Sequence, residues 1–308
     1  MITTVCLNPC FDKTVELDSL KTGVVNRVRN IRVDPGGKGI NVAMAARRLG
    51  LNVQCIGIMG EDGAAELSGM LDREGLRHHF LTVPGRVRTN LKIVQKSEKG
   101  TTEINEQGTG VDTAALNDFF AMAKEETRDS DIVVFNGSLP PGCPQGTYRD
   151  LMLSLEGKKC ILDTEGAELE LGAKKAHPFL IKPNLHEMEV TLGLELRTMR
   201  SIRDAALLFL RLGVQHTVIS MGSMGAMYVD HEKTLFAPAL RVEAKCTVGA
   251  GDAMLGGMLL GYEREGEMSR AFRYGVAAGA ASVITEGTQL IVPADFERMI
   301  DQVRVQEV

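Results

Sequence analysis

Residues 131–137 read DIVVFNG, in which four apolar residues stand in a row and the run ends at a polar residue and a glycine. Five other short apolar runs resemble it, and each precedes a longer segment with the apolar spacing of a helix: TVCLN at 4–8, VQCIGIMG at 53–60, CILDTE at 160–165, FLIKPN at 179–184 and HTVISMG at 216–222. Strands and helices that alternate in this way are typical of parallel βαβ units. The sequence therefore predicts an α/β protein built on a mainly parallel sheet, with successive helices in its last third.

Two segments that interrupt this alternation of strands and helices have a different pattern. Residues 14–33 and 90–108 alternate apolar with polar residues and contain turn glycines, which is typical of strands. We expect two insertions, 13–35 and 87–108, to pair into a smaller sheet that forms a lid over the carboxyl edge of the parent sheet, where open α/β folds bind ligands. Two separate surface hairpins are the alternative. No internal repeat or low-complexity tract is visible, and a single domain is expected over residues 1–308.

The composition excludes several classes of protein. A chain of 308 residues with 44% hydrophobic content can bury a large core, and its net charge of -5 argues against nucleic acid as the main partner. The first residues lack a basic segment before an apolar run, and no stretch approaches the roughly 20 apolar residues of a membrane span. We therefore expect a cytoplasmic protein without a membrane partner. The six cysteines include no CxxC pair, which favours buried free thiols over a zinc site or a disulfide framework.

A second stretch, CTVGAGDAM at 246–254, places residues with almost no side chain directly before a carboxylate. A helix that begins here points unpaired N–H groups at whatever lies beyond its end, and glycines let an anion approach that backbone closely. An acid beside a bound phosphate makes chemical sense if it accepts the proton of a hydroxyl that attacks the phosphate. The alternative is that Asp252 only compensates the helix dipole.

A glycine cluster, DPGGKGINVA at 34–43, opens an amphipathic helix and offers backbone donors together with Lys38 and Asn41. The cluster is not a P-loop, because the pattern GxxxxGK[ST] is absent. It is not GxGxxG either, so a nucleotide-dependent dehydrogenase loses its main support. Taken alone, Lys38 is typical of a solvated surface lysine and Asn41 of a polar residue on a helix.

Together, GGKGINVA and TVGAGDAM resemble the two signatures of the ribokinase-like, phosphofructokinase B type sugar kinases. Further segments match that family in the expected order: LNPCFD at 7–12, GSLPPG at 137–142, KPNLHE at 182–187 and SMGSMG at 220–225. The resemblance covers nearly the whole chain. It implies a three-layer α/β/α core with a small β-sheet lid, and a kinase that uses ATP and Mg²⁺.

The resemblance also implies roles at the phosphoryl-transfer centre. Asp252 would be the catalytic base, and the amides of Gly249, Ala250 and Gly251 would form an anion hole for the transferring phosphoryl group. Electrostatic stabilisation of the phosphoryl oxygens would then act beside the group that takes the proton.

The nucleotide and its metal ion would lie next to this centre. By the resemblance, Asn184 and Glu187 would organise Mg²⁺ and its waters, although an N-x-x-E pattern by itself favours a helix cap. The residues matched to nucleotide binding are Lys182, Asn184, Ser220, Gly222, Gly225, Thr247, Val248, Ala278 and Ser282.

For the acceptor sugar, the resemblance matches Asp12 to an acid that holds hydroxyl groups. The other positions of the same pocket are Gly37, Asn41 and Ser138. An acceptor that already carries a phosphate also needs cations, and the candidates are Arg27, Lys38, Arg86 and Arg88. Arginine suits this task because it offers a two-pronged donor to phosphate. Without the resemblance, Asp12 would be a strand-end turn residue and the arginines solvated.

Within the family, VNR at 25–27 and TEINEQG at 102–108 look most like the 1-phosphofructokinase branch. This implies ATP-dependent phosphorylation of fructose 1-phosphate at its 6-hydroxyl to give fructose 1,6-bisphosphate. Tagatose-6-phosphate kinase and 6-phosphofructokinase of the same family are the alternatives. Val87 and Cys246 depart from the family pattern, in which Thr and Ser or Asp are common. A sugar-phosphate sensor without turnover is disfavoured, because a binding protein has no use for the acid in GAGD.

The lid segments carry more apolar residues than one substrate pocket can cover. They are Val24, Val25, Val28, Ile31, Val33, Leu91, Ile93, Val94 and Ile104. A small sheet is marginal alone, and an exposed apolar face is a natural contact between two copies. We therefore expect a two-fold homodimer joined lid to lid, which the resemblance also implies.

Overall fold

The computed structural model describes residues 1–95, 101–285 and 290–308, so part of the second insertion lies outside the described residues. Its strands are β1 (Ile2–Cys6), β2 (Cys10–Leu17), β3 (Asn30–Gly36), β4 (Val53–Asp62), β5 (Arg77–Arg86), β6 (Arg88–Gln95), β7 (Thr101–Asn105), β8 (Ile132–Asn136), β9 (Lys159–Asp163), β10 (Leu180–Ile181), β11 (His216–Ser220), β12 (Ala226–Val229), β13 (Thr234–Ala237) and β14 (Gln306–Glu307). Its helices are α1 (Lys38–Arg48), α2 (Ala64–Arg73), α3 (Thr113–Glu126), α4 (Thr147–Ser154), α5 (Gly166–Ala176), α6 (Leu185–Leu192), α7 (Met199–Arg211), α8 (Ala250–Glu265), α9 (Met268–Val283) and α10 (Pro293–Ile300), with a short 3-10 turn, η1 (Gly222–Met224).

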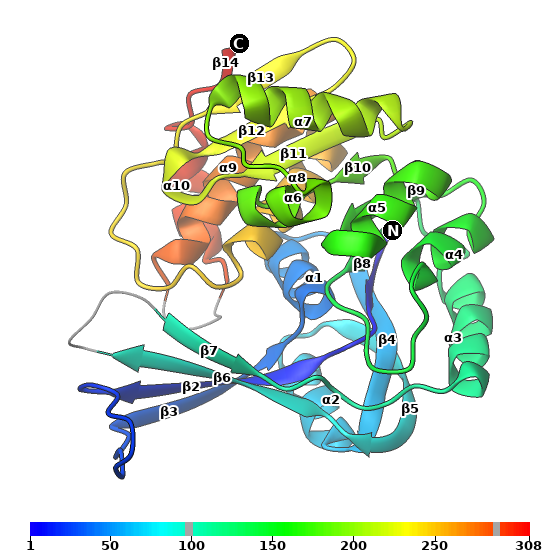
Figure 1. The fold of residues 1–308 in the computed structure, drawn as a ribbon, viewed down its shortest axis with the longest axis vertical. Helices are drawn as coiled ribbons and strands as arrows, with labels where there is room; N and C mark the ends of the chain where they lie inside the picture. The colour runs from blue at the N-terminus through cyan, green and yellow to red at the C-terminus, as the bar shows by residue number, and fades with distance from the viewer. Residues whose placement is uncertain (96–100, 286–289) are drawn as a thin grey trace.

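A large twisted sheet forms the middle of the molecule, in the order β14-β13-β12-β11-β10-β9-β8-β1-β4-β5 (Figure 1). Neighbouring strands from β11 to β5 are all parallel, and β12, β13 and β14 extend the sheet with antiparallel pairs. The predicted α/β fold with a mainly parallel sheet is therefore confirmed. In the ranges described, no helix is long and apolar enough to cross a membrane.

The strand β8 shows why the quoted run is apolar at every position. Ile132 and Val134 pack into a core shared with α1, α8 and α9, while Val133 and Phe135 pack into a second core shared with α3, α4 and α7. Because successive side chains of a strand point to opposite faces, a strand covered by helices on both sides must be apolar on both. The result is a three-layer α/β/α arrangement.

The order of the strands reverses next to β1. The chain proceeds from β1 to β4 and β5 on one side, then returns to β8 on the other side and continues to β9, β10 and β11. Crossovers that leave in opposite directions open a crevice at the carboxyl ends of the two central strands, which is where open α/β sheets bind ligands. The crevice here lies at the ends of β1 and β8.

A second sheet, in the order β3-β2-β6-β7, projects from the body beside this crevice (Figure 1). Strands β2 and β6 pair in parallel from Cys10↔Arg88 to Leu17↔Gln95, so the two insertions form one sheet and not two separate hairpins. Side chains alternate along it: Asp12 and Lys92 line the crevice, while Val15 and Ile93 pack together on the opposite face.

Helix α8, which carries the GAGD sequence, lies unusually close to its neighbours because its glycines face them. A Cβ atom on Gly256 would lie 2.8 Å from the Cβ of Ala45 in α1, and one on Gly257 would lie 2.5 Å from the carbonyl oxygen of Tyr274 in α9. Such distances are too short for any side chain larger than hydrogen. The glycines therefore fix the position from which the first turn of α8 meets the crevice.

Candidate active site

The crevice is a cavity of about 980 Å³, a size typical of sites for small molecules and cofactors. Its wall is formed by the carboxyl ends of the central strands, the first turns of α1 and α8, and the inner face of the small sheet. Most of the residues singled out in the sequence lie on this wall: Asp12, Gly37, Lys38, Asn41, Arg88, Ser138, Lys182, Asn184, Glu187, Ser220, Gly222, Gly225, Thr247, Val248, Gly249, Ala250, Gly251 and Asp252. Segments from the whole length of the chain thus meet in one place.

Four of the predicted residues do not line the cavity: Arg27, Arg86, Ala278 and Ser282. Arg27 lies in the exposed connection between β2 and β3, because the small sheet carries that loop away from the crevice. Arg27 is therefore not brought to the cavity of its own chain, and its contact with the acceptor stays a prediction.

Ala278 and Ser282 are buried on the other side of α9 from the cavity. A Cβ on Gly257 of α8 would lie 2.4 Å from the Cβ of Ala278, which shows that this face packs against α8. The residues of α9 that line the cavity are Val276, Gly279, Ala280 and Val283. Their spacing of three and four is that of one helix face, so Ala278 and Ser282 lie off the face that lines the cavity, and their part in nucleotide binding stays a prediction.

The first turn of α8 presents backbone and a carboxylate to the cavity. Gly249, with φ 79, occupies the N-cap position, and no side chain caps the helix. A Cβ on Gly251 would lie 3.1 Å from the Nζ of Lys182, so the missing side chain lets a buried ammonium group approach the helix end. Positive charge and helix N–H groups together favour an anion at this point.

Asp252 is only 6% exposed, and its Oδ2 accepts a hydrogen bond of 2.8 Å from Nδ2 of Asn41 in α1. Burial, reinforced by the negative charge of Asp163, raises the pKa of Asp252 to about 6, against the opposing effects of Lys38 and Asn41. A carboxylate with a pKa near neutrality is a stronger base than an exposed aspartate and is still ionised at pH 7.

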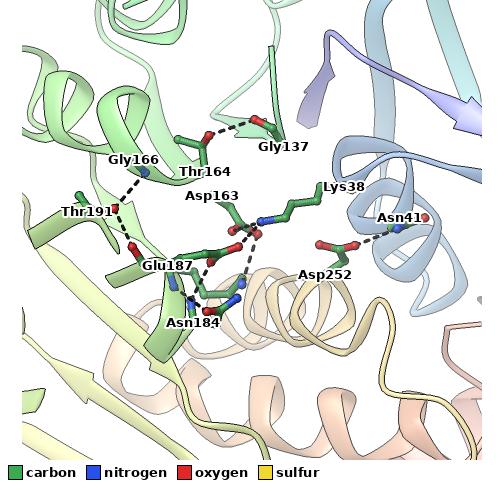
Figure 2. A network of polar contacts seen from close by, with 11 residues as sticks. Lys38, Asn41, Gly137, Asp163, Thr164, Gly166, Asn184, Glu187, Thr191 and Asp252 are labelled. Atoms are coloured by element: carbon green, nitrogen blue, oxygen red, sulfur yellow. Dashed lines mark hydrogen bonds and ion pairs between the residues drawn. The ribbon is translucent and has the colours of Figure 1, made fainter. Parts of the chain in front are cut away.

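A buried ion network occupies the floor of the cavity (Figure 2). Lys38 Nζ lies 2.7 Å from Oε1 of Glu187 and 3.5 Å from Oδ1 of Asp163, and Lys182 Nζ lies 3.3 Å from Oδ2 of Asp163. Burial alone would lower the pKa of Lys38, but the carboxylates of Asp163, Glu187 and Asp252 raise it above its ordinary value. Burial likewise opposes ionisation of Asp163, yet the two lysines hold its pKa below the ordinary value. The network therefore places two lysine side chains where an anionic substrate would enter.

Asp163 was not predicted from the sequence, although it stands at the end of the apolar run CILDTE. An acid that directly follows a buried parallel strand lies at the carboxyl edge of the sheet, and this position is the signal that could have identified it.

The N-x-x-E segment forms the cap that its pattern favours by itself. Oδ1 of Asn184 accepts from the Glu187 amide, and Oε2 of Glu187 accepts from the Asn184 amide, both at 2.8 Å. This capping box begins α6 and leaves Oε1 of Glu187 directed at Lys38. The cap does not exclude a second role, because the other carboxylate oxygen faces the cavity network.

The carboxylates in this network fit a magnesium ion that arrives with a nucleotide. Within residues 1–95, 101–285 and 290–308, no group of three or more His, Cys, Asp or Glu side chains could enclose a metal ion. Mg²⁺ rarely needs such a cage, since it usually binds one or two carboxylates and completes its shell with phosphate oxygens and water. Glu187 and Asp163 supply buried carboxylate oxygens of that kind.

At the other end of the cavity, Asp12 forms an ion pair of 2.7 Å with Lys92 across the small sheet. Both residues are 3% exposed, and Lys92 neutralises a carboxylate that would otherwise be buried without a counter-charge. Lys92 was not predicted, because a lysine in an alternating strand is ordinarily read as a solvent-facing residue. Only the pairing of β2 with β6 places it two positions from Asp12 on the inner face.

Arg88 lines the cavity but also holds the backbone around it. Its Nε and Nη2 donate to the carbonyl oxygen of Asn8 at 3.2 and 2.9 Å, and Nη1 donates to that of Glu106 at 2.9 Å. The guanidinium thereby ties the segment after β1 to the segment after β7. It keeps N–H groups for a ligand, because a guanidinium has five.

Comparison with known proteins identifies the relatives of this chain. Residues 6–295 match the pattern described as pfkB family carbohydrate kinase. A protein of Xanthomonas campestris pv. campestris named 1-phosphofructokinase is 37% identical over 260 residues, which are 83% of this chain and 82% of that protein. A Bacillus subtilis protein of the same name is 32% identical over 99% of both chains. A solved structure described as the tetrameric inhibited form of phosphofructokinase-2 from Escherichia coli superimposes with a TM-score of 0.90, 27% identity and 98% coverage of each chain.

Proposed function

Since the chain belongs to the pfkB family of carbohydrate kinases, we propose that it transfers the γ-phosphoryl group of ATP to the 6-hydroxyl of fructose 1-phosphate, giving fructose 1,6-bisphosphate. The position of Asp252 carries the proposal: a carboxylate with a raised pKa lies in the helix turn whose backbone N–H groups face the cavity, beside Lys38 and Lys182. The choice of fructose 1-phosphate is supported by the names of the relatives from Xanthomonas campestris and Bacillus subtilis.

The chemistry follows from where these groups lie. Asp252 takes the proton of the 6-hydroxyl as its oxygen forms a bond to the γ-phosphorus, and the bond from phosphorus to the bridging oxygen breaks to release ADP. The amides of Gly249, Ala250 and Gly251, with Lys182 and Lys38, stabilise the charge on the phosphoryl oxygens. Asn41 keeps Oδ2 of Asp252 in place during the transfer.

Glu187, Asn184 and Asp163 would hold Mg²⁺, which would supply charge neutralisation at the phosphates. The nucleotide itself would lie against Ser220, Gly222 and Gly225 at one end. Thr247, Val248 and the cavity face of α9 would surround its base, since these are the least polar parts of the wall.

The acceptor sugar would lie under the small sheet, between Asp12 and Asn41. Ser138 and Gly37 border the same space, and Arg88 and Lys38 are the cations nearest to it. Since Arg27 lies outside the cavity of its own chain, it reaches an acceptor only by movement of the lid or from a second copy. ATP and phosphosugars belong to the cell interior, so a cytoplasmic location is part of this proposal.

The dimer is also part of the proposal. Exposed apolar side chains gather on the small sheet and its connection, with Val25 84%, Val24 60%, Ile104 57%, Ile31 51%, Val28 43% and Val33 37% exposed. Ile93 is covered within its own chain and does not contribute. A homodimer joined lid to lid would cover this face.

A direct test compares fructose 1-phosphate, fructose 6-phosphate and tagatose 6-phosphate as acceptors, with ATP and Mg²⁺, and measures kcat/KM for each. We expect the highest value on fructose 1-phosphate. Phosphofructokinase-2 is the name of a structural neighbour, so a preference for fructose 6-phosphate would replace the proposed substrate within the same family. Tight binding of a phosphosugar without formation of product would instead support the alternative of a sugar-phosphate sensor without turnover.

A further inference from the structure

Asn136 ends β8 at the point where the strand order reverses, and its side chain is 1% exposed. It forms part of the cavity wall. Among the residues that the structure describes, neither Oδ1 nor Nδ2 of this amide has a hydrogen-bond partner, whereas its backbone oxygen accepts a bond from the Tyr148 hydroxyl. A buried amide with both polar atoms unsatisfied raises the free energy of the folded state. A ligand that forms hydrogen bonds with these two atoms would remove that cost.

The neighbours of Asn136 define which part of the cavity it faces. In the sheet register Asn136 lies directly beside Asp163 of β9, and the side chains of both follow the face on which Val134 and Ile161 pack. On its other side is β1, whose last residue, Cys6, also lines the cavity. Gly137, the next residue in the chain, lies close to Lys38 (Figure 2).

Along the carboxyl edge of the sheet, the proposed acceptor site and the proposed nucleotide site therefore lie at the ends of different strands. The end of β1 leads to Asp12 and the small sheet, on the acceptor side, while β9, β10 and β11 lead to Asp163, Lys182 and Ser220, on the nucleotide side. Asn136 stands between them, next to the phosphoryl-transfer centre on its acceptor side. A primary amide there can accept from one hydroxyl and donate to another oxygen, which suits a sugar with neighbouring hydroxyl groups.

We propose that the side-chain amide of Asn136 binds the acceptor sugar through its hydroxyl groups, as a further substrate-binding and specificity-determining residue. The inference rests on the proposed function, because it assumes a sugar-phosphate acceptor in this cavity. Other buried side chains of the described residues also carry an oxygen without a hydrogen-bond partner, among them Thr4, Thr14 and Thr217 away from the cavity wall and Asn41 and Asn90 on it. Asn136 differs from all of these because both polar atoms of its amide lack a partner.

The test uses Asn136→Leu, which keeps nearly the same volume and removes both polar atoms. We expect the KM of the acceptor to rise about ten-fold or more, the loss of one to two uncharged hydrogen bonds, while the KM of ATP stays within about two-fold. The unfolding temperature without ligand should stay the same or rise, because an unsatisfied buried amide has been removed. The matched control is Thr217→Val, which also removes an unpartnered buried oxygen and should change neither KM.

A second variant, Asn136→Ser, retains a polar group that is too short to reach the same hydroxyls, and it covers the case in which the leucine variant does not fold. An unchanged acceptor KM in either folded variant would overturn the inference, as would an equal rise in both KM values with a lowered unfolding temperature, which indicates a structural role. All variants are assayed with the acceptor that the wild type prefers. A preference for another phosphosugar would therefore contradict the proposed substrate and still leave the role of Asn136 measurable.

Discussion

At the scale of single residues, Asp252 shows a conflict between stability and chemistry. The side chain is buried and its pKa is raised to about 6 from an ordinary value of 3.8. An acid with a raised pKa stabilises the folded state only while it is protonated, so this stability is present below pH 3.8 and is lost as the pH rises through about 6. At pH 7 the ionised group therefore destabilises the fold, on the order of 1–3 kcal/mol.

The first prediction replaces that group. Asp252→Asn should lower kcat by about 10²–10⁴, because an amide cannot take the proton of the acceptor hydroxyl. The same variant should unfold at a higher temperature than the wild type at pH 7.5, and this advantage should shrink at pH 5 as the wild-type acid becomes protonated. Asp204→Asn, at an exposed position on α7, is the control and should change neither quantity. Near-normal turnover in a folded Asp252→Asn enzyme would mean that Asp252 only compensates the helix dipole.

The second prediction concerns pH. Because the base must be ionised, kcat/KM of the wild type should fall below about pH 6, following the pKa of Asp252 in the free enzyme. The phosphate groups of both substrates also titrate, so the residual activity of the Asp252→Asn variant provides the reference. The ratio of wild-type kcat/KM to that of the Asp252→Asn variant should fall as the pH drops below about 6. A ratio that does not change with pH would mean that the loss of activity at acidic pH comes from titration of the substrate phosphates.

A third prediction concerns Arg88, which both lines the cavity and binds two backbone carbonyl groups. Arg88→Ala should raise the KM of the phosphosugar by about ten-fold to a hundred-fold, the effect of a lost charge-assisted contact, with a smaller change for ATP. Arg86→Ala is the comparison, since Arg86 is 70% exposed and pairs with Glu106 outside the main cavity. Equal changes in both KM values for Arg88→Ala would mean that the arginine acts only through the backbone it holds.

At the scale of helices and strands, the sequence predicted where each element lies in the chain better than which face of a helix lines the cavity. The apolar runs identified the central strands because both of their sides are covered, and the last third identified α8, α9 and α10. The second half of α9, residues 275–283, is small and mostly apolar on every side, so its pattern could not show which face packs on α8 and which lines the cavity. For this reason Ala278 and Ser282 were singled out, although other positions of the same helix line the cavity.

The residues that the sequence missed have a common cause. Asp163 and Lys92 are recognised as candidate site residues only from the structure, in which strands distant in the chain place them beside Lys182 and Asp12 respectively. Local pattern carries no information on such pairs. Conversely, the residues within GAGD and GGKG could be predicted, because a helix end and a glycine cluster are local features whose chemistry is visible in a few residues.

The fourth prediction tests the close packing of α8. Gly256→Val should destabilise the protein by about 1–3 kcal/mol, because the new side chain would enter the space of Ala45 and its backbone. It should also lower kcat, since α8 carries Asp252 and α1 carries its partner Asn41. The control is Gly69→Ala in α2, where the added carbon meets only the end of the Arg73 side chain at 3.7 Å. This change should stabilise the helix by about 0.5–1 kcal/mol. Chemical denaturation measures both.

At the scale of the whole molecule, the small sheet has two faces with different tasks. The inner face places Asp12 and Lys92 in the cavity, while the outer side and the connection from β2 to β3 leave valines and isoleucines exposed. A sheet that acts as the proposed lid must be stiff enough to position its inner face, yet four strands with one open apolar side have little stability of their own. Pairing with a second copy would resolve this conflict, because the partner would cover the open side.

The last prediction therefore joins assembly to catalysis. Val25→Asp, at the most exposed of these apolar positions, should convert a dimer into monomers in light scattering across a dilution series, because a charge cannot be buried in an apolar contact without a partner. Loss of the partner should loosen the lid, raise the KM of the phosphosugar and increase hydrolysis of ATP without acceptor, since water then reaches the transferring group. Val190→Asp on α6 is the control, as Val190 is also apolar and 55% exposed but lies outside the small sheet. If the wild type is a monomer at every concentration and still shows no ATP hydrolysis without acceptor, closure of the lid does not depend on a second copy, and the kinase assignment stands without the dimer.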